Sequence, residues 1–283
     1  MAKLVLTLDR SAERALADRA ERLKSRRPPI DLNPMERAVH FLRGTYSRAT
    51  LALPQFYLLL ASNNDDDEQP CGIEGYPGLI FKHAIRFSSI GTISLACRKV
   101  FDHATTGLTG ASFSKCSKEN LEKVAQYWAS KSNRSIQDAL SALQFLQLIF
   151  RDCARTHSDL LSSTAPLSRR IGLLKQYADR SAAHLSMENY EWSPLDCAHV
   201  VAALAVIGEI IRGFDDPSEQ PTYYDTIDQA SLIAARKLFP ALPDVRLFQH
   251  IEVEAYSRRC WQSGPDLGRK MLLEELPYAI GWY

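Results

Sequence analysis

The chain has 283 residues, 46% of them hydrophobic, and a formal net charge of +1 at pH 7. This length and composition are typical of a packed globular protein with one large domain or two modest ones. The near-zero charge excludes a global electrostatic attraction to nucleic acid or to an anionic membrane, so any contact with RNA has to be local.

The cysteines and the apolar runs indicate the compartment. No two cysteines form a Cys-x-x-Cys pair, so we expect neither a metal site nor a disulfide framework, and a reducing cytoplasm suits the free thiols. The longest apolar run, residues 51–61, contains a proline and is too short to span a bilayer. We therefore expect a cytoplasmic protein that makes no membrane contact. The six cysteines are Cys71, Cys97, Cys116, Cys153, Cys197 and Cys260.

The N-terminal part of the chain predicts short elements that end in an acidic linker. Residues 3–8 are mostly apolar and partly alternating, which fits a short strand or an extended lead-in. Residues 33–36 (Asn-Pro-Met-Glu) supply the cap, the first-turn proline and the returning acid of a helix. Because residues 63–70 are rich in Asn and Asp, we place a boundary there. An N-terminal helical extension is expected at 1–62.

Residues 76–213 are predicted to form a core of five helices. A long helix with one apolar side begins near Pro77, and Ser117 and Ser135 can cap the two helices that follow. The last two helices form a hairpin over residues 164–212. This part of the chain is expected to be a self-contained helical bundle.

The two arms of the hairpin have separate start signals. Thr164 can cap the first arm, with Pro166 in its first turn. Ser193, Pro194 and Asp196 supply the cap, the first-turn proline and the returning acid of the second arm. The second arm is apolar over most of its circumference, so we expect it at the centre of the core. Its apolar residues are Val200, Val201, Leu204, Ala205, Ile207, Ile210 and Ile211.

The C-terminal part of the chain predicts further helices. Helical spacing indicates one near residues 227–239 and another that starts at Asp244. We expect a C-terminal helical extension at 214–283. The fold class predicted for the whole chain is all-α, a multi-helix bundle with helical extensions at both ends.

A polar pair lies at the tip of the hairpin. Arg180 and His184 are four residues apart, so on a continuing helix their side chains leave from the same face. The guanidinium can bind a non-bridging oxygen of a phosphodiester, and the histidine, with a reference pKa near ~6.5, can move a proton at neutral pH. The plainer interpretation is an exposed arginine and a histidine that is stabilised by the C-terminal end of the helix dipole.

Residues 178–184 (Ala-Asp-Arg-Ser-Ala-Ala-His), followed by a short polar stretch and a strongly apolar helix, resemble the HEPN superfamily, specifically its abortive-infection branch. Asp179 matches the polar position of the family pattern, and Ala183 with His184 matches its alanine-preceded histidine. Ala178 stands at the position where the family has an arginine, and Arg180 is the nearest arginine.

The resemblance implies an up-and-down helical core and a metal-independent ribonuclease or toxin of a defence system, often a homodimer. In that role His184 activates the ribose 2′-hydroxyl or protonates the leaving oxygen, Arg180 stabilises the phosphorane-like charge, and Asp179 orients the histidine. The implied partners are RNA and a second copy of the chain, and no metal or other cofactor is implied. The competing interpretation, favoured by Ala178, is a catalytically inactive helical module that binds a protein partner.

An alternative site lies earlier in the chain. Arg151, Asp152 and His157 match the bare spacing of arginine, polar residue and histidine. Residues six apart on a continuous helix are rotated by about 240°, so Arg151 and His157 face different ways unless the helix breaks between them.

Overall fold

The computed structural model describes residues 32–63, 73–179, 193–215 and 223–280. Contacts divide the chain into two units, Met1–Asn33 and Pro34–Tyr283, and the helices described below belong to the second. All regular elements in these ranges are helical, which confirms the all-α prediction. The short strand or extended lead-in predicted at residues 3–8 lies outside the described ranges.

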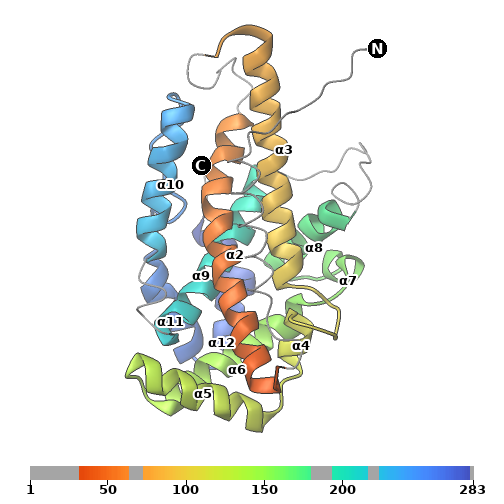
Figure 1. Ribbon diagram of the computed structural model, residues 1–283, viewed down its shortest axis with the longest axis vertical. Coiled ribbons are helices and arrows are strands. Elements are labelled where there is room, and N and C mark those ends of the chain that lie inside the picture. The colour runs from red at the N-terminus through yellow and green to blue at the C-terminus, as the bar shows by residue number, and fades with distance from the viewer. Residues whose placement is uncertain (1–31, 64–72, 180–192, 216–222, 281–283) are drawn as a thin grey trace, which may run out of the picture. The chain divides into compact units, whose positions relative to one another are not determined.

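The helices of the second unit follow one another with short connections. Figure 1 shows α2 and α3 side by side along the unit, α10 along another flank and α5 across one end. The elements are α2 (Pro34–Ser62), α3 (Gly75–Val100), α4 (Gly110–Ser114), α5 (Lys118–Ser132), α6 (Ile136–Cys153), α7 (His157–Leu161), α8 (Pro166–Tyr177), α9 (Pro194–Phe214), α10 (Tyr224–Leu238), α11 (Val253–Gln262), α12 (Pro265–Lys270), a wider helical turn η3 (Met271–Glu275) and α13 (Leu276–Ala279).

Helix α9 is the central element of the core. It contacts α2, α3, α5, α6, α8, α11 and α13, and nearly all of its residues are buried. This position follows from its apolar circumference and confirms the prediction for the second arm of the hairpin. Among the described helices, only α9 is long and apolar enough to cross a membrane, and 83% of the tested stretch is buried inside the unit.

Helix α2 packs directly on the central helix. It runs without interruption through Pro54, and it contacts α9, α3 and α10. The predicted division into 1–62, 76–213 and 214–283 remains a prediction. In the described unit, α2 and α10 to α13 pack against helices of the 76–213 segment or against each other.

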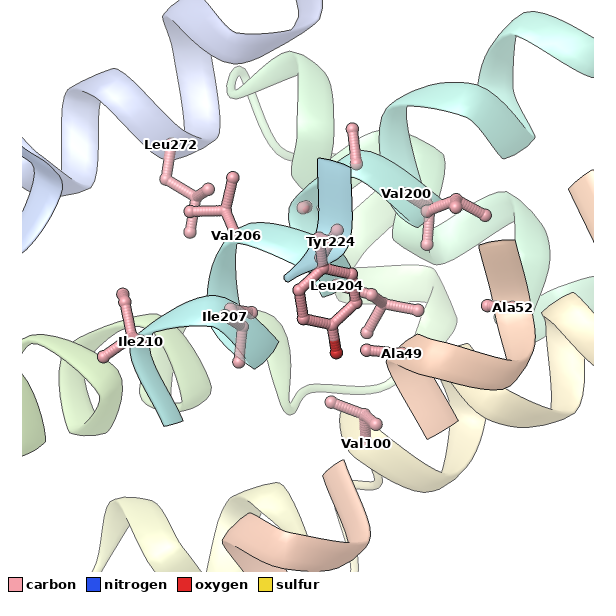
Figure 2. Packing of buried hydrophobic residues seen from close by; sticks show 14 of the residues in the cluster. Ala49, Ala52, Val100, Val200, Leu204, Val206, Ile207, Ile210, Tyr224 and Leu272 are labelled. Atoms are coloured by element: carbon pink, nitrogen blue, oxygen red, sulfur yellow. The ribbon is translucent and has the colours of Figure 1, made fainter. Parts of the chain in front are cut away.

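The buried side chains form one continuous cluster around α9. Figure 2 shows the ring of Tyr224 between α9 and α2, near Ala49 and Leu204. The hydroxyl of Tyr224 donates to the backbone oxygen of Tyr46 at 3.3 Å and lies 3.3 Å from Oγ1 of Thr50. A buried phenol needs such partners, and here they join α10 to α2.

Most of the predicted helix starts are confirmed. The hydroxyls of Ser117, Ser135 and Ser193 each accept a hydrogen bond from a backbone N–H in the first turn. The predicted cap at Thr164 is wrong. Helix α8 begins one residue later, with Ala165 in the cap position and Pro166 at the first helical position. The proline supplies the required backbone angle and removes one N–H that would otherwise need a partner.

The predicted helix from Asp244 is also wrong, because α11 begins only at Val253. Before α11, backbone N–H groups donate to buried side chains of other helices. The N–H of Leu247 donates to the hydroxyl of Tyr57 at 2.6 Å, and the N–H of Phe248 lies 3.4 Å from a carboxylate oxygen of Asp228. These tertiary hydrogen bonds take the donors that a helix would use for itself.

Candidate functional site

Asp179 is the one residue of the first predicted site that the structure describes. It follows α8 by two residues and continues its helical path. Arg180 and His184 lie outside the described residues, so their expected roles remain predictions.

The carboxylate of Asp179 lies between a guanidinium and an imidazole. Nε of Arg98 donates a hydrogen bond to Oδ1 of Asp179. Nδ1 of His157 lies 3.6 Å from Oδ2 of the same carboxylate, an ion-pair distance when the imidazole is protonated. The side chains of Arg98, His157 and Asp179 are 37%, 29% and 28% exposed, so a dissolved ligand can reach them. These three residues are called the Arg98 cluster below.

Three helices carry the Arg98 cluster. Arg98 lies in the last turn of α3, where a cation is stabilised by the free carbonyl groups of the helix end. Helix α6 ends at Cys153, and Thr156 starts α7 by accepting a hydrogen bond from the N–H of Asp159 at 3.2 Å. His157 is the first residue of α7. The chain therefore breaks between α6 and α7, and the break directs His157 toward the end of α8.

A buried lysine joins the segments that hold the cluster. Lys175 is 1% exposed and lies one helical turn before Asp179. Its Nζ donates to the backbone oxygen of Phe101 at 2.8 Å and also to that of Arg155. Burial lowers the pKa of Lys175, and the carboxylates of Asp102 and Asp179 oppose that change. The ammonium group thus links α8 to the end of α3 and to the α6–α7 connection.

The second predicted site is divided between two ion-pair groups. Asp152 accepts a hydrogen bond from Nε of Arg269, and its Oδ1 lies 3.8 Å from Nε of Arg151. His157 pairs with Asp179 instead. The structure therefore brings together one residue from each predicted site, Asp179 and His157.

The Arg98 cluster combines three useful chemical groups. A guanidinium is a fixed cation that can bind a phosphate oxygen, and an imidazole can accept or donate a proton near neutral pH. The Asp179 carboxylate lies on the Nδ1 side of the His157 ring, at 3.6 Å, and Nε2 makes no hydrogen bond within the described ranges. This set is suited to acid–base chemistry at an anionic ester.

Two residues of this region were not predicted as site members, and their signals were weak. Arg98 is separated from Asp179 by 81 positions, so no local spacing relates them. Lys175 follows the apolar residue Leu174 and lies four residues after Ile171 on the buried side of α8. A lysine on an apolar stripe is the one sequence feature that marks this helix end as unusual.

Neither a metal-ligand group among the described residues nor a similar protein points to a further site. Within the described ranges, no group of three or more His, Cys, Asp or Glu side chains is arranged to hold a metal ion. Comparisons of the chain with protein-family models, with curated proteins and with solved structures found no match. The functional inference therefore depends on the Arg98 cluster and on the sequence around it.

Proposed function

We propose that the protein is a HEPN-like, RNA-acting protein whose reaction is metal-independent endonucleolytic cleavage at the end of α8. One observation carries this proposal. The half-buried carboxylate of Asp179 has the Arg98 guanidinium on one oxygen and the His157 imidazole on the other, directly before Arg180 in the chain. A histidine with an orienting carboxylate and neighbouring arginines is a suitable set for a phosphodiester.

The proposed reaction uses the ribose 2′-hydroxyl as the nucleophile. A histidine, His157 or His184, accepts the proton of this hydroxyl while the oxygen attacks phosphorus. The bond from phosphorus to the 5′-oxygen breaks, and the leaving oxygen takes a proton from a general acid, so that a 2′,3′-cyclic phosphate and a 5′-hydroxyl result. Arg98 and Arg180 stabilise the charge on the non-bridging oxygens, and Asp179 holds His157 in position.

The resemblance adds the biological setting of the proposal. The protein is proposed to be a cytoplasmic toxin or antiviral defence component that acts as a homodimer. RNA is the proposed substrate class, and no cofactor has a role in the proposed step.

A second candidate function is a catalytically inactive module that binds a protein partner. Ala178, which stands at the expected arginine position, is only 3% exposed, so this position faces the core. Helix α3 also exposes large apolar side chains, with Tyr76 at 75% and Phe87 at 63%. These observations favour a binding role if catalysis is absent.

The test is cleavage of a mixed RNA pool in EDTA by the purified wild type and by single variants. For a histidine that moves the proton, replacement by alanine is expected to slow cleavage by at least about 10²-fold. His157→Ala and His184→Ala therefore identify the histidine that transfers the proton, and Arg98→Ala and Arg180→Ala test the cations. His40→Ala is the matched control, because His40 is an exposed residue of α2.

The Arg151→Ala variant tests which of the two predicted sites carries the cleavage activity. Asp152, its ion-pair partner, belongs to a different group from Asp179, so this change is expected to leave cleavage intact. Loss of cleavage in Arg151→Ala, with activity retained in Arg98→Ala, would place the active site at the C-terminal end of α6. A folded wild type that leaves the RNA pool uncut overturns the endoribonuclease proposal and favours the binding module.

A further inference from the structure

A cavity of about 510 Å³ lies at the start of α2, and no residue of the Arg98 cluster lines it. Its walls are the first two turns of α2, the loop after α3, helix α4 and the start of α5. This volume lies within the usual range for small-molecule sites. We propose that the cavity binds a ribonucleoside phosphate, either free or at the end of an RNA chain. The proposal does not depend on catalysis by the Arg98 cluster.

The charge of the lining favours an anion. Arg37 and Lys115 line the cavity, and no Asp or Glu is among its lining residues. Glu36 and Glu119 lie in the first turns of α2 and α5 but do not line the cavity, and Glu119 bonds to Lys123 at 2.6 Å within its own helix. Helices α2 and α5 both begin at the cavity, so their N-terminal dipole ends add positive potential to that of the two side chains.

The exposed part of the remaining lining is polar and suits a sugar or the edge of a base. Phe41 and Phe113 lie behind this lining, are 2% and 3% exposed, and pack on each other with ring centres 5.6 Å apart. The side chains of Thr105, Thr106 and Asn120 also line the cavity and make no hydrogen bond within the described part of the chain. They remain available for sugar hydroxyls or base edges. Inorganic phosphate would occupy only a small part of the 510 Å³, and a fatty acid would leave the polar side chains unused.

Hydrogen bonds hold the loop side of the cavity in shape. Oγ1 of Thr109 accepts from the N–H of Ser112 at 3.1 Å, and Oγ of Ser112 donates to the backbone oxygen of Thr105 at 2.8 Å. The side chain of Gln147 donates to the backbone oxygen of Cys116 at 2.8 Å. A site held in this way loses little conformational freedom when a ligand binds.

Cys116 provides a reporter inside the cavity. It lines the wall and is half-buried, whereas Cys97, Cys153, Cys197 and Cys260 are buried. Burial raises the pKa of the Cys116 thiol, so alkylation is followed at about pH 9, where more thiolate is present. A Cys71→Ser background removes the one cysteine outside the described residues. Peptide mapping then reports the alkylation rate of Cys116.

The experiment measures Cys116 alkylation and calorimetric binding with defined probes. The probes are the four ribonucleoside 5′-monophosphates, a 5′-phosphorylated RNA pentamer, adenosine and inorganic phosphate. At least one monophosphate or the pentamer is expected to slow alkylation. Protection by the monophosphate indicates a free nucleotide as the ligand, and protection by the pentamer alone indicates an RNA end.

The variants test which residues form the site. Arg37→Ala and Lys115→Ala are each expected to raise the Kd about tenfold, because each removes a charge-assisted contact to phosphate. Thr106→Trp, at an exposed loop position, is expected to fill the cavity and abolish binding while the helical circular dichroism is retained. Lys118→Ala is the matched control, since Lys118 is 82% exposed and does not line the cavity.

Three outcomes overturn the proposal. The first is no protection by any monophosphate or by the pentamer. The second is equal protection by inorganic phosphate, which reduces the cavity to a simple anion site. The third is binding that is unchanged in Arg37→Ala, Lys115→Ala and Thr106→Trp. RNA cleavage by the Arg98 cluster is measured separately. A negative binding result for the cavity therefore does not contradict the proposed function.

Discussion

The hydroxyl of Tyr57 donates a 2.6 Å hydrogen bond to Oδ1 of Asp228 inside the core. The pair connects α2 to α10, and both side chains are fully buried. The other carboxylate oxygen lies 3.4 Å from the N–H of Phe248. Burial raises the pKa of Asp228 to about 6, although these two hydrogen bonds oppose the change. The carboxyl group is therefore a source of pH-dependent stability.

We expect Asp228→Asn to change how stability varies with pH. The native pKa of about 6 lies above the unfolded value, so the native state binds more protons between about pH 4 and pH 6. The Asp228 contribution is fully present below pH 4 and is lost as the pH rises through 6, a change of about 3 kcal/mol. The asparagine variant lacks this loss. Urea unfolding of both proteins in roughly unit steps from about pH 4 to about pH 8 measures this difference in the free energy of unfolding. Curves of stability against pH that run parallel for the two proteins would contradict the expectation.

His199 is expected to make the protein less stable as the pH falls, the opposite of the dependence due to Asp228. Burial, helped by the charge of Arg170, lowers the pKa of His199 to about 4, and its Nε2 lies 3.3 Å from the backbone oxygen of Ile280. The unfolded chain takes up a proton below about pH 6.5 and the native chain does not, so about 3 kcal/mol is lost between about pH 6.5 and pH 4. His199→Gln is expected to remove this acid-side loss in urea unfolding. His40→Gln, at an exposed position of α2, is expected to retain it.

The sequence predicted those features that depend on neighbouring residues. The start of α9 is one example, because the capping box between Ser193 and Asp196 is complete within four residues. The helix expected at Asp244 does not form, because the N–H groups of Leu247 and Phe248 bond to side chains of α2 and α10. No local pattern carries the information that a distant carboxylate or phenol will take a backbone donor.

The candidate site shows the same limit. Asp179 was predicted as a site residue from a short motif, whereas its partner Arg98 lies 81 positions away and becomes a neighbour only when α3 packs against α8. His157 was predicted as part of a different group. The spacing pattern assigned it to Arg151 and Asp152, and the break between α6 and α7 directs it to Asp179.

Two glycines of similar helical setting are expected to respond oppositely to alanine. A Cβ on Gly268 would lie 1.8 Å from the backbone oxygen of Cys260, so α11 and α12 must move apart. We expect Gly268→Ala to lower the free energy of unfolding by about 3 kcal/mol or more. A Cβ on Gly91 meets nothing within 4 Å, so Gly91→Ala is expected to stabilise α3 by about 0.5–1 kcal/mol. Urea unfolding of both variants measures the difference, and a tolerated Gly268→Ala would show that the α11–α12 contact is loose.

The buried pair Glu209 and Arg212 is expected to show strong coupling. Nε of Arg212 donates to both carboxylate oxygens of Glu209, at 2.8 and 2.9 Å, and the guanidinium lies 3.9 Å from the ring centre of Tyr223. The side chains of Glu209 and Arg212 are 2% and 10% exposed. Arg212→Met retains an apolar stem but leaves the carboxylate buried without its cation. We expect this variant to lose about 3–5 kcal/mol at pH 8.

The pH dependence and the double variant distinguish charge from packing in this pair. Burial already raises the pKa of Glu209, and loss of the guanidinium raises it further, so the carboxyl group of Arg212→Met becomes neutral at mildly acidic pH. Its destabilisation relative to the wild type should therefore shrink as the pH falls. Adding Glu209→Gln should restore more than half of the loss at pH 8, because no buried charge remains. A destabilisation that is constant with pH and additive in the double variant would mean that the lost stability comes from packing, including the contact with Tyr223.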